Sequence, residues 1–113
     1  MQIPSSGFPY WLFQGFTAQN GIAHMNADGT QIVYDHPAVI EAVSHWFDPS
    51  GKHRVMRTGV IEWGTTPRDF FERKIAMMWT TTGTLTNVKN NAKFDFGVAI
   101  PPTNKRRVSR APT

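Results

Sequence analysis

The sequence predicts a mixed α/β fold in which short helices alternate with buried strands. Two short apolar runs, Ile75–Trp79 and Phe94–Ile100, predict strands. Apolar residues recur at helical spacing within residues 37–47, which predicts an amphipathic helix. Alternating runs on either side of Asn26–Thr30 predict a β-hairpin, because the segment between them is rich in turn-forming residues.

The first predicted helix begins near Pro9, since proline is favoured at the first helical position. Leu12, Phe13 and Phe16 recur at helical spacing, and Asn20–Gly21 predicts the helix end. Trp11 lies early in this helix and has two interpretations. It is either an ordinary core residue, which is the commoner case, or part of a cleft wall whose flat face stacks on a sugar or polyol.

The second predicted helix has Asp35 as its N-cap and Pro37 in its first turn. We expect its apolar stripe to face the core and Asp48–Gly51 to end the helix. The stripe consists of Val39, Ile40, Val43, Trp46 and Phe47. Further along, Thr66–Asp69 has the form of a capping box with Thr66 as the N-cap, which predicts the start of a third helix.

A hydroxyl-rich loop, Thr80–Thr84, lies between the first predicted strand and another short helix. The first N–H groups of a helix lack partners inside it, and threonine hydroxyls beside them add donors and acceptors. Gly83 permits close approach of the backbone. The loop therefore suits a small polar or anionic ligand. The alternative, and the commoner situation, is that Thr82 or Thr84 simply caps the helix.

Composition limits the classes of function. The chain has 113 residues, enough for one domain, and no cysteine, which excludes disulfides, thiolate zinc sites and a cysteine nucleophile. No apolar run is long enough to span a membrane. The net charge of +4 comes from residues 105–113, where Lys105, Arg106, Arg107 and Arg110 have no acidic neighbour. A basic tail can contact nucleic acid, but no nucleic-acid motif accompanies it.

Signs of catalysis are weak. The four histidines lie on different predicted elements without a second ligand at helical spacing, so we expect no metal site and no cofactor. No nucleophile elbow or phosphate-binding loop is present. A glycosidase-type pair such as Glu62 with Asp95 is conceivable, but nothing in the sequence brings these two carboxylates together. We therefore expect a binding protein with no catalytic residues, not an enzyme.

Several segments, in order along nearly the whole chain, together resemble the solute-binding proteins of ABC importers. The closest branch is the one that binds sugars and glycerol-3-phosphate. The matching segments are Ser6–Trp11, Ala18–Gly21, Asp35–Ala38, Trp63–Gly64, Phe71–Met78, Thr81–Val88 and Ala92–Val98, followed by Pro101 or Pro102. Each segment is weak alone, and their order and spacing make the resemblance fairly specific.

The resemblance implies a periplasmic-binding-protein-like (type II) α/β fold, with residues 1–104 as part of the second lobe. Residues 105–113 would then be a basic tail leading to a hinge segment that this chain lacks. It also implies a monomer in the periplasm or on the extracellular face, which presents a sugar or polyol-phosphate to ABC permease subunits in the membrane, with no nucleic-acid partner. Because half of the binding cleft would be missing, we expect the chain alone to bind weakly or not at all.

The resemblance also assigns ligand-binding residues. Trp11 matches a tryptophan that lines the cleft, Thr81 and Thr82 match a hydroxyl pair that contacts the ligand, and Gly83 matches the glycine that follows. Arg73 departs from the pattern, because it stands where the family usually has glycine, and Thr in place of Ser puts a preference for glycerol-3-phosphate in doubt. The alternative function is a small structural or interaction domain with a tail that contacts nucleic acid.

Overall fold

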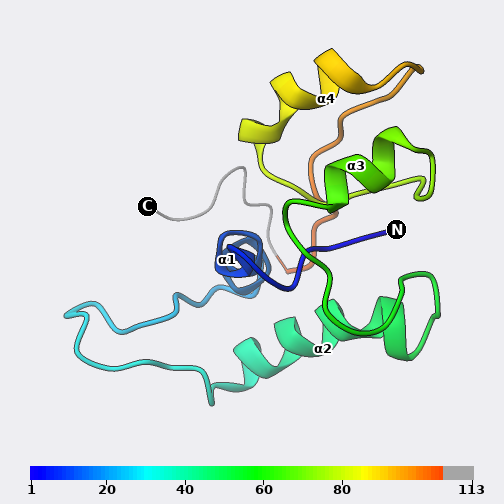
Figure 1. The fold of residues 1–113 in the computed structure, drawn as a ribbon. Coiled ribbons are helices and arrows are strands. Elements are labelled where there is room, and N and C mark those ends of the chain that lie inside the picture. The colour runs from blue at the N-terminus through cyan, green and yellow to red at the C-terminus, as the bar shows by residue number, and fades with distance from the viewer. Residues whose placement is uncertain (106–113) are drawn as a thin grey trace.

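The computed structural model describes residues 1–105 and contains short helices joined by long irregular segments (Figure 1). Helix α1 lies between α2 on one side and α3 with α4 on the other (Figure 1). The helices are α1 (Pro9–Gln19), α2 (Pro37–Gly51), α3 (Thr66–Phe71), the 3₁₀ turn η1 (Thr82–Thr84) and α4 (Leu85–Asn91). Of the predicted basic tail, only Lys105 falls within the described residues.

The described residues form no β-sheet. Extended segments meet only at isolated bridges, which pair Gln2 with Met78, Ser6 with Glu62 and Met25 with Ile32. The predicted α/β fold of the periplasmic-binding-protein (type II) class is therefore wrong for residues 1–105. The physical reason is that an extended segment becomes a β-strand only when its backbone hydrogen-bonds to a neighbouring strand. The run at 75–79 finds one bridging residue on the N-terminal segment, and the run at 94–100 finds none.

The N-terminal segment, residues 1–6, joins the two sides of the molecule. The N–H of Gln2 donates to the carbonyl of Met77 at 3.0 Å, and the carbonyl of Gln2 accepts from Trp79 at 2.9 Å. Three residues later, the N–H of Ser5 donates to the carbonyl of Ile61 at 2.8 Å. These bonds satisfy part of the extended backbone without forming a ladder.

The core lies between α1, α2 and the N-terminal segment. Phe16 is its centre, because its ring lies 5.4 Å from the Trp46 ring of α2 and 4.7 Å from the Trp79 ring. The buried members of this cluster are Ile3, Leu12, Phe16, Ala42, Trp46, Met56 and Ile61. Burial of these side chains supplies the main stabilisation of the fold.

The prediction for the apolar stripe of α2 is only partly confirmed. Val39 and Trp46 are buried, but Ile40, Val43 and Phe47 are exposed. Helix α2 packs against the rest of the molecule through a narrow face, on which Ala42 is the third buried residue. The rest of the stripe is left exposed, and two of its residues, Val43 and Phe47, line an open apolar cavity.

Two predicted helix starts are wrong by one residue. His36, not Asp35, caps α2, because its Nδ1 accepts a hydrogen bond from the N–H of Ala38 at 3.1 Å. Thr66 is the first residue of α3 and not its cap, and its hydroxyl donates to the carbonyl of Glu62 at 2.9 Å. Helix α2 ends at Gly51, within the predicted segment Asp48–Gly51, and includes Pro49.

Candidate ligand-binding surface

Trp11 lies on the outside of α1, turned away from the core residues of the same helix. It is 48% exposed, so the core interpretation of this residue is wrong. Its ring stacks on Phe8 at 5.3 Å and meets the edges of Tyr10 and Trp63 at 5.7 and 6.4 Å. These four residues form what we call the aromatic surface.

Gly7 sets the geometry of this surface. Its φ of +84° lies in the left-handed region that favours glycine, and a Cβ built there would come within 2.9 Å of the Cβ of Trp63. The backbone can therefore approach Trp63 closely, and Phe8 then reaches the Trp63 ring at 6.3 Å. The turn before α1 thus positions the rings around Trp11.

The predicted threonine loop forms η1 and the start of α4. Thr82 and Gly83 are exposed, and Thr81 is half-buried. Within residues 1–105, the hydroxyls of Thr81 and Thr82 make no hydrogen bond, so both are free to bind a ligand. Thr84 occupies the N-cap position of α4, as the capping interpretation predicts, but its side chain makes no capping hydrogen bond. Its hydroxyl instead shares a hydrogen bond with that of Thr80 at 2.8 Å.

The aromatic surface and the threonine loop come from separate parts of the chain. Among the described residues, no hydrogen bond or ring contact joins Trp11 to Thr81–Gly83. The two regions are connected through α1, because Trp79 lies just before the loop and packs on Phe16. The structure thus provides an exposed stacking ring on α1 and, in the loop before α4, two hydroxyls without a hydrogen-bond partner among residues 1–105, and neither cavity described below is lined by these residues.

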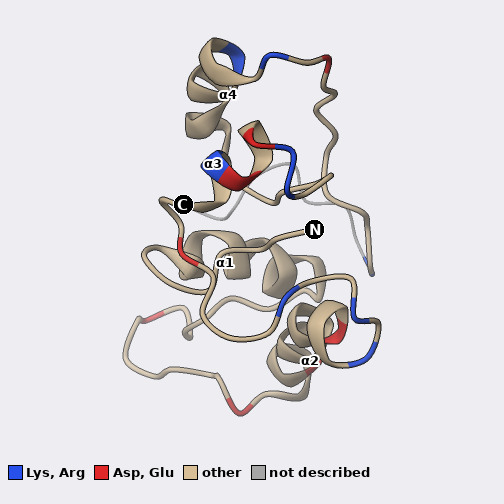
Figure 2. Cartoon of the chain, turned by 45° about the vertical axis from the view of Figure 1, so that its right-hand side comes forward, with Lys and Arg blue, Asp and Glu red and all other residues tan. Residues whose placement is uncertain are grey.

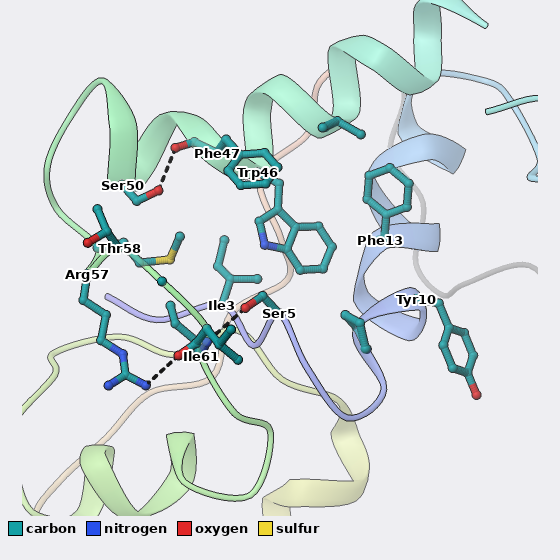
Figure 3. A pocket seen from close by; sticks show the side chains of 15 residues that line it. Ile3, Ser5, Tyr10, Phe13, Trp46, Phe47, Ser50, Arg57, Thr58 and Ile61 are labelled. Carbon is teal, nitrogen blue, oxygen red and sulfur yellow. Dashed lines mark hydrogen bonds between the residues drawn. The ribbon is translucent and has the colours of Figure 1, made fainter. Parts of the chain in front are cut away.

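An apolar cavity of about 600 Å³ opens between α1, α2 and residues 56–61 (Figure 3). In Figure 3, Trp46 and Phe47 lie on one side of it, and Ile3 and Ile61 lie on the other. Arg57 is the charged residue in its wall, and its guanidinium donates to the carbonyl of Val60 at 3.4 Å. Sequence reasoning missed this cavity, because an apolar stripe looks the same whether it faces protein or an open space.

A second, polar cavity of about 350 Å³ lies between the end of α1, the middle of α2 and residues 102–104. Its walls include Phe16, Gln19, Glu41, His45, Asp48 and Asn104. Lys105 lies beside it and forms an ion pair with Glu41 at 2.7 Å. The hydrogen bond from Lys105 lowers the pKa of the Glu41 carboxyl below its ordinary value. None of these residues was predicted as a site residue.

Other charged and titratable groups are dispersed. Lys and Arg are interleaved with Asp and Glu over both ends of the described molecule (Figure 2). His24 bonds to the hydroxyls of Thr17 and Tyr34 at 3.0 and 3.2 Å, and its partial burial lowers its pKa below 6.5. In residues 1–105, no group of three or more His, Cys, Asp or Glu side chains is placed to hold a metal ion.

No helix in the described part of the chain has the length and apolarity needed to cross a bilayer. Comparison of the chain with models of protein families, with curated proteins and with solved structures gives no match.

Proposed function

We propose that this chain is part of the substrate-binding component of an ABC importer for carbohydrate or glycerol-3-phosphate-like solutes. The observation that carries the proposal is the position of Trp11, which presents nearly half of its surface to solvent within a cluster of three further rings. Isolated exposed aromatics are ordinary, but a group of them indicates a binding surface. The order of the sequence segments that resemble this family is the second support.

The proposed chemistry uses two kinds of contact. The flat face of Trp11 stacks on the C–H face of a sugar ring, while Phe8 holds the indole in place. The hydroxyls of Thr81 and Thr82 are free to donate to, or accept from, the hydroxyl or phosphate oxygens of the solute. The chain binds and presents its ligand without chemical change, and its partner is the permease in the membrane.

Replacement of Trp11 by Ala tests the stacking contact. Saturation-transfer NMR detects weak binding, so it suits the chain with glucose, maltose and glycerol-3-phosphate as separate probes. We expect the affinity to fall by about tenfold, since burial of a large apolar side chain contributes about 1.5–3 kcal/mol and 1.4 kcal/mol is a factor of ten. Phe47→Ala is the matched control, because Phe47 is exposed but lies on the apolar cavity.

The threonine loop is tested separately with Thr81→Val and Thr82→Val, which remove the hydroxyl and keep the shape. Loss of one hydrogen bond to a ligand should weaken binding about five- to tenfold for each substitution. If Trp11→Ala leaves the affinity for every bound probe unchanged, the aromatic surface is not the binding site. If only the threonine variants lack an effect, the solute binds through the rings without the loop.

A further inference from the structure

Two carboxylates line the polar cavity, and Lys105 beside it already pairs with one of them. Glu41 and Asp48 contribute carboxylates from α2, and they lie seven residues apart, on one face of the helix. Among the described residues that line the cavity, none is Lys or Arg. Carboxylates in a partly enclosed space attract a cation more strongly than they do in open water. The wall therefore favours a positively charged occupant.

The C-terminal end of α1 also favours a cation in the cavity. The helix ends at Gln19, in the wall of the cavity, and its last turn contains no basic residue. The carbonyl end of a helix carries a partial negative charge, which stabilises a nearby cation. Backbone and side chains thus agree in the charge that they prefer.

Gln19 contributes a hydrogen-bond donor to the wall of the cavity. The residue is only 6% exposed, and its Oε1 accepts a hydrogen bond from the N–H of Asn104 at 3.0 Å. This bond fixes which end of the amide is the oxygen. The Nε2 group of Gln19 has no hydrogen-bond partner among residues 1–105, although Gln19 lines the cavity. Because this Nε2 is not fully enclosed, it donates to solvent in the cavity, and an occupant that carries oxygen can accept from it in place of water.

The floor of the cavity is aromatic. The rings of Phe16 and His45 lie 5.4 Å apart and both residues line the space. Ring faces accept either the C–H groups of a carbohydrate or a cation. A bare metal ion would not use this floor, whereas a small organic ammonium compound would.

Lys105 shows how an ammonium group binds at this place. Its Nζ lies 2.7 Å from Glu41, and the neighbouring Asn104 donates to Asn20 at 2.6 Å. The segment at 102–105 is thereby attached across the edge of the cavity. Glu41 is occupied by this internal cation, while Asp48 has no ion-pair partner among the described residues.

We propose that the polar cavity is a binding site for a small hydroxylated primary amine of the amino-sugar class. The ammonium group pairs with Asp48, a hydroxyl or ring oxygen accepts from Gln19, and the carbon skeleton lies on Phe16 and His45. The volume of about 350 Å³ lies within the range of about 300–1,000 Å³ that is usual for small-molecule sites. This site is separate from the aromatic surface and does not depend on the importer proposal.

Isothermal titration of the chain with D-glucosamine tests the site, with D-glucose and N-acetyl-D-glucosamine as uncharged controls. We expect glucosamine to bind about tenfold more tightly than either control, since only its ammonium group can make a charge-assisted hydrogen bond to Asp48. Equal binding of the three compounds, or no binding of glucosamine, would overturn the proposal.

Substitutions then assign the contacts. Asp48→Asn should weaken glucosamine binding about tenfold, whereas Asp35→Asn, which removes an exposed carboxylate elsewhere, should have no effect. Gln19→Met, which keeps the length of the side chain, should weaken binding to a smaller extent. An unchanged affinity in Asp48→Asn contradicts the proposal even if Gln19→Met does not fold.

Lys105→Met should change the affinity for glucosamine in the opposite direction. Removal of the internal ammonium frees Glu41 for the ligand, so glucosamine should bind several-fold more tightly. A loss of glucosamine binding in Trp11→Ala, with no loss in Asp48→Asn, would move the ligand to the aromatic surface and exclude the polar cavity.

Discussion

The two sides of this molecule are held together in different ways. The side formed by α1 and α2 contains a continuous cluster of large buried side chains around Phe16 and Trp46. The side formed by α3 and α4 buries far less, with Val88 as its buried apolar residue among those described. There, Phe70 meets the edges of Phe94 and Phe96 at 5.2 and 6.5 Å. The first side has a core, and the second is held by a few ring contacts.

The ends of α1 and α3 sharpen this comparison. Both helices end in the same pair of hydrogen bonds. In α1, Gly21 and Ile22 donate to Ala18 and Thr17, at 3.0 and 3.1 Å. In α3 the corresponding bonds run from Arg73 to Phe70 and from Lys74 to Asp69, at 3.0 and 2.9 Å.

This is the Schellman arrangement, which places the residue after the cap in the left-handed region. Gly21 takes that position in α1 with φ +82°, and Arg73 takes it in α3 with φ +59°. The sequence resemblance places glycine at the position of Arg73 as well. The local geometry is therefore kept on the weaker side of the molecule, but with a residue that is strained in it.

The largest expected effect is on the free energy of unfolding when a buried residue is truncated on each side of the molecule. Trp46→Ala should lower the free energy of unfolding by about 3–5 kcal/mol, because it removes a large buried side chain that packs on Phe16 in the core. Val88→Ala removes two methyl groups and should lower it by about 2 kcal/mol. Urea unfolding followed by circular dichroism measures both. Equal losses would contradict the description of one side as a core and the other as a thin contact layer.

The next largest change in stability is expected from substitutions at the helix ends. Gly21→Ala should destabilise by about 1–2 kcal/mol, and the strain comes from φ alone, since an added Cβ there meets no atom within 4 Å. Gly15→Ala is the matched control, because this glycine lies inside α1 with equal free space and should stabilise by about 1 kcal/mol.

Arg73→Gly should change stability by less than about 1 kcal/mol. Relief of the strain of about 1–2 kcal/mol is offset by the greater freedom of glycine in the unfolded chain and by loss of the cation–π contact of Arg73 with Phe94. Thermal unfolding measures this change. A loss as large as that of Gly21→Ala would mean that the ring contact, and not the backbone, determines this helix end.

The smallest expected effect is the pH dependence of folding stability, which should arise on the side formed by α1 and α2. Burial lowers the pKa of His24 in the folded chain below 6.5, so the unfolded chain binds this proton more readily. Stability should therefore decrease as the pH falls through about 6.5 toward the lower pKa of the folded state. Hydrogen exchange should show this loss near α1, and His24→Gln should remove it. An unchanged pH dependence in His24→Gln would exclude His24 as the cause.

The candidate sites show which residues could be found from the sequence alone and which could not. The residues assigned by the resemblance, Trp11 and Thr81–Gly83, are exposed or half-buried in the structure. The polar cavity was missed because Gln19, Asp48 and Asn104 are far apart in the chain and belong to no motif. Such a site exists only when the end of α1 meets α2 and residues 102–104.

The sequence by itself determined the features that depend on near neighbours along the chain. These are the helix from Pro9, its end at Gly21, and the turn at Asn26, whose side-chain oxygen accepts from the N–H of Thr30 at 2.9 Å. Helical and turn hydrogen bonds close within a few residues, so local patterns predict them.

Only the tertiary structure decided whether the apolar runs became strands, which face of α2 was buried, and whether Trp11 lay inside or outside. Each of these depends on a partner that is distant in sequence. A strand needs a second strand, and an apolar side chain is buried only where another surface covers it.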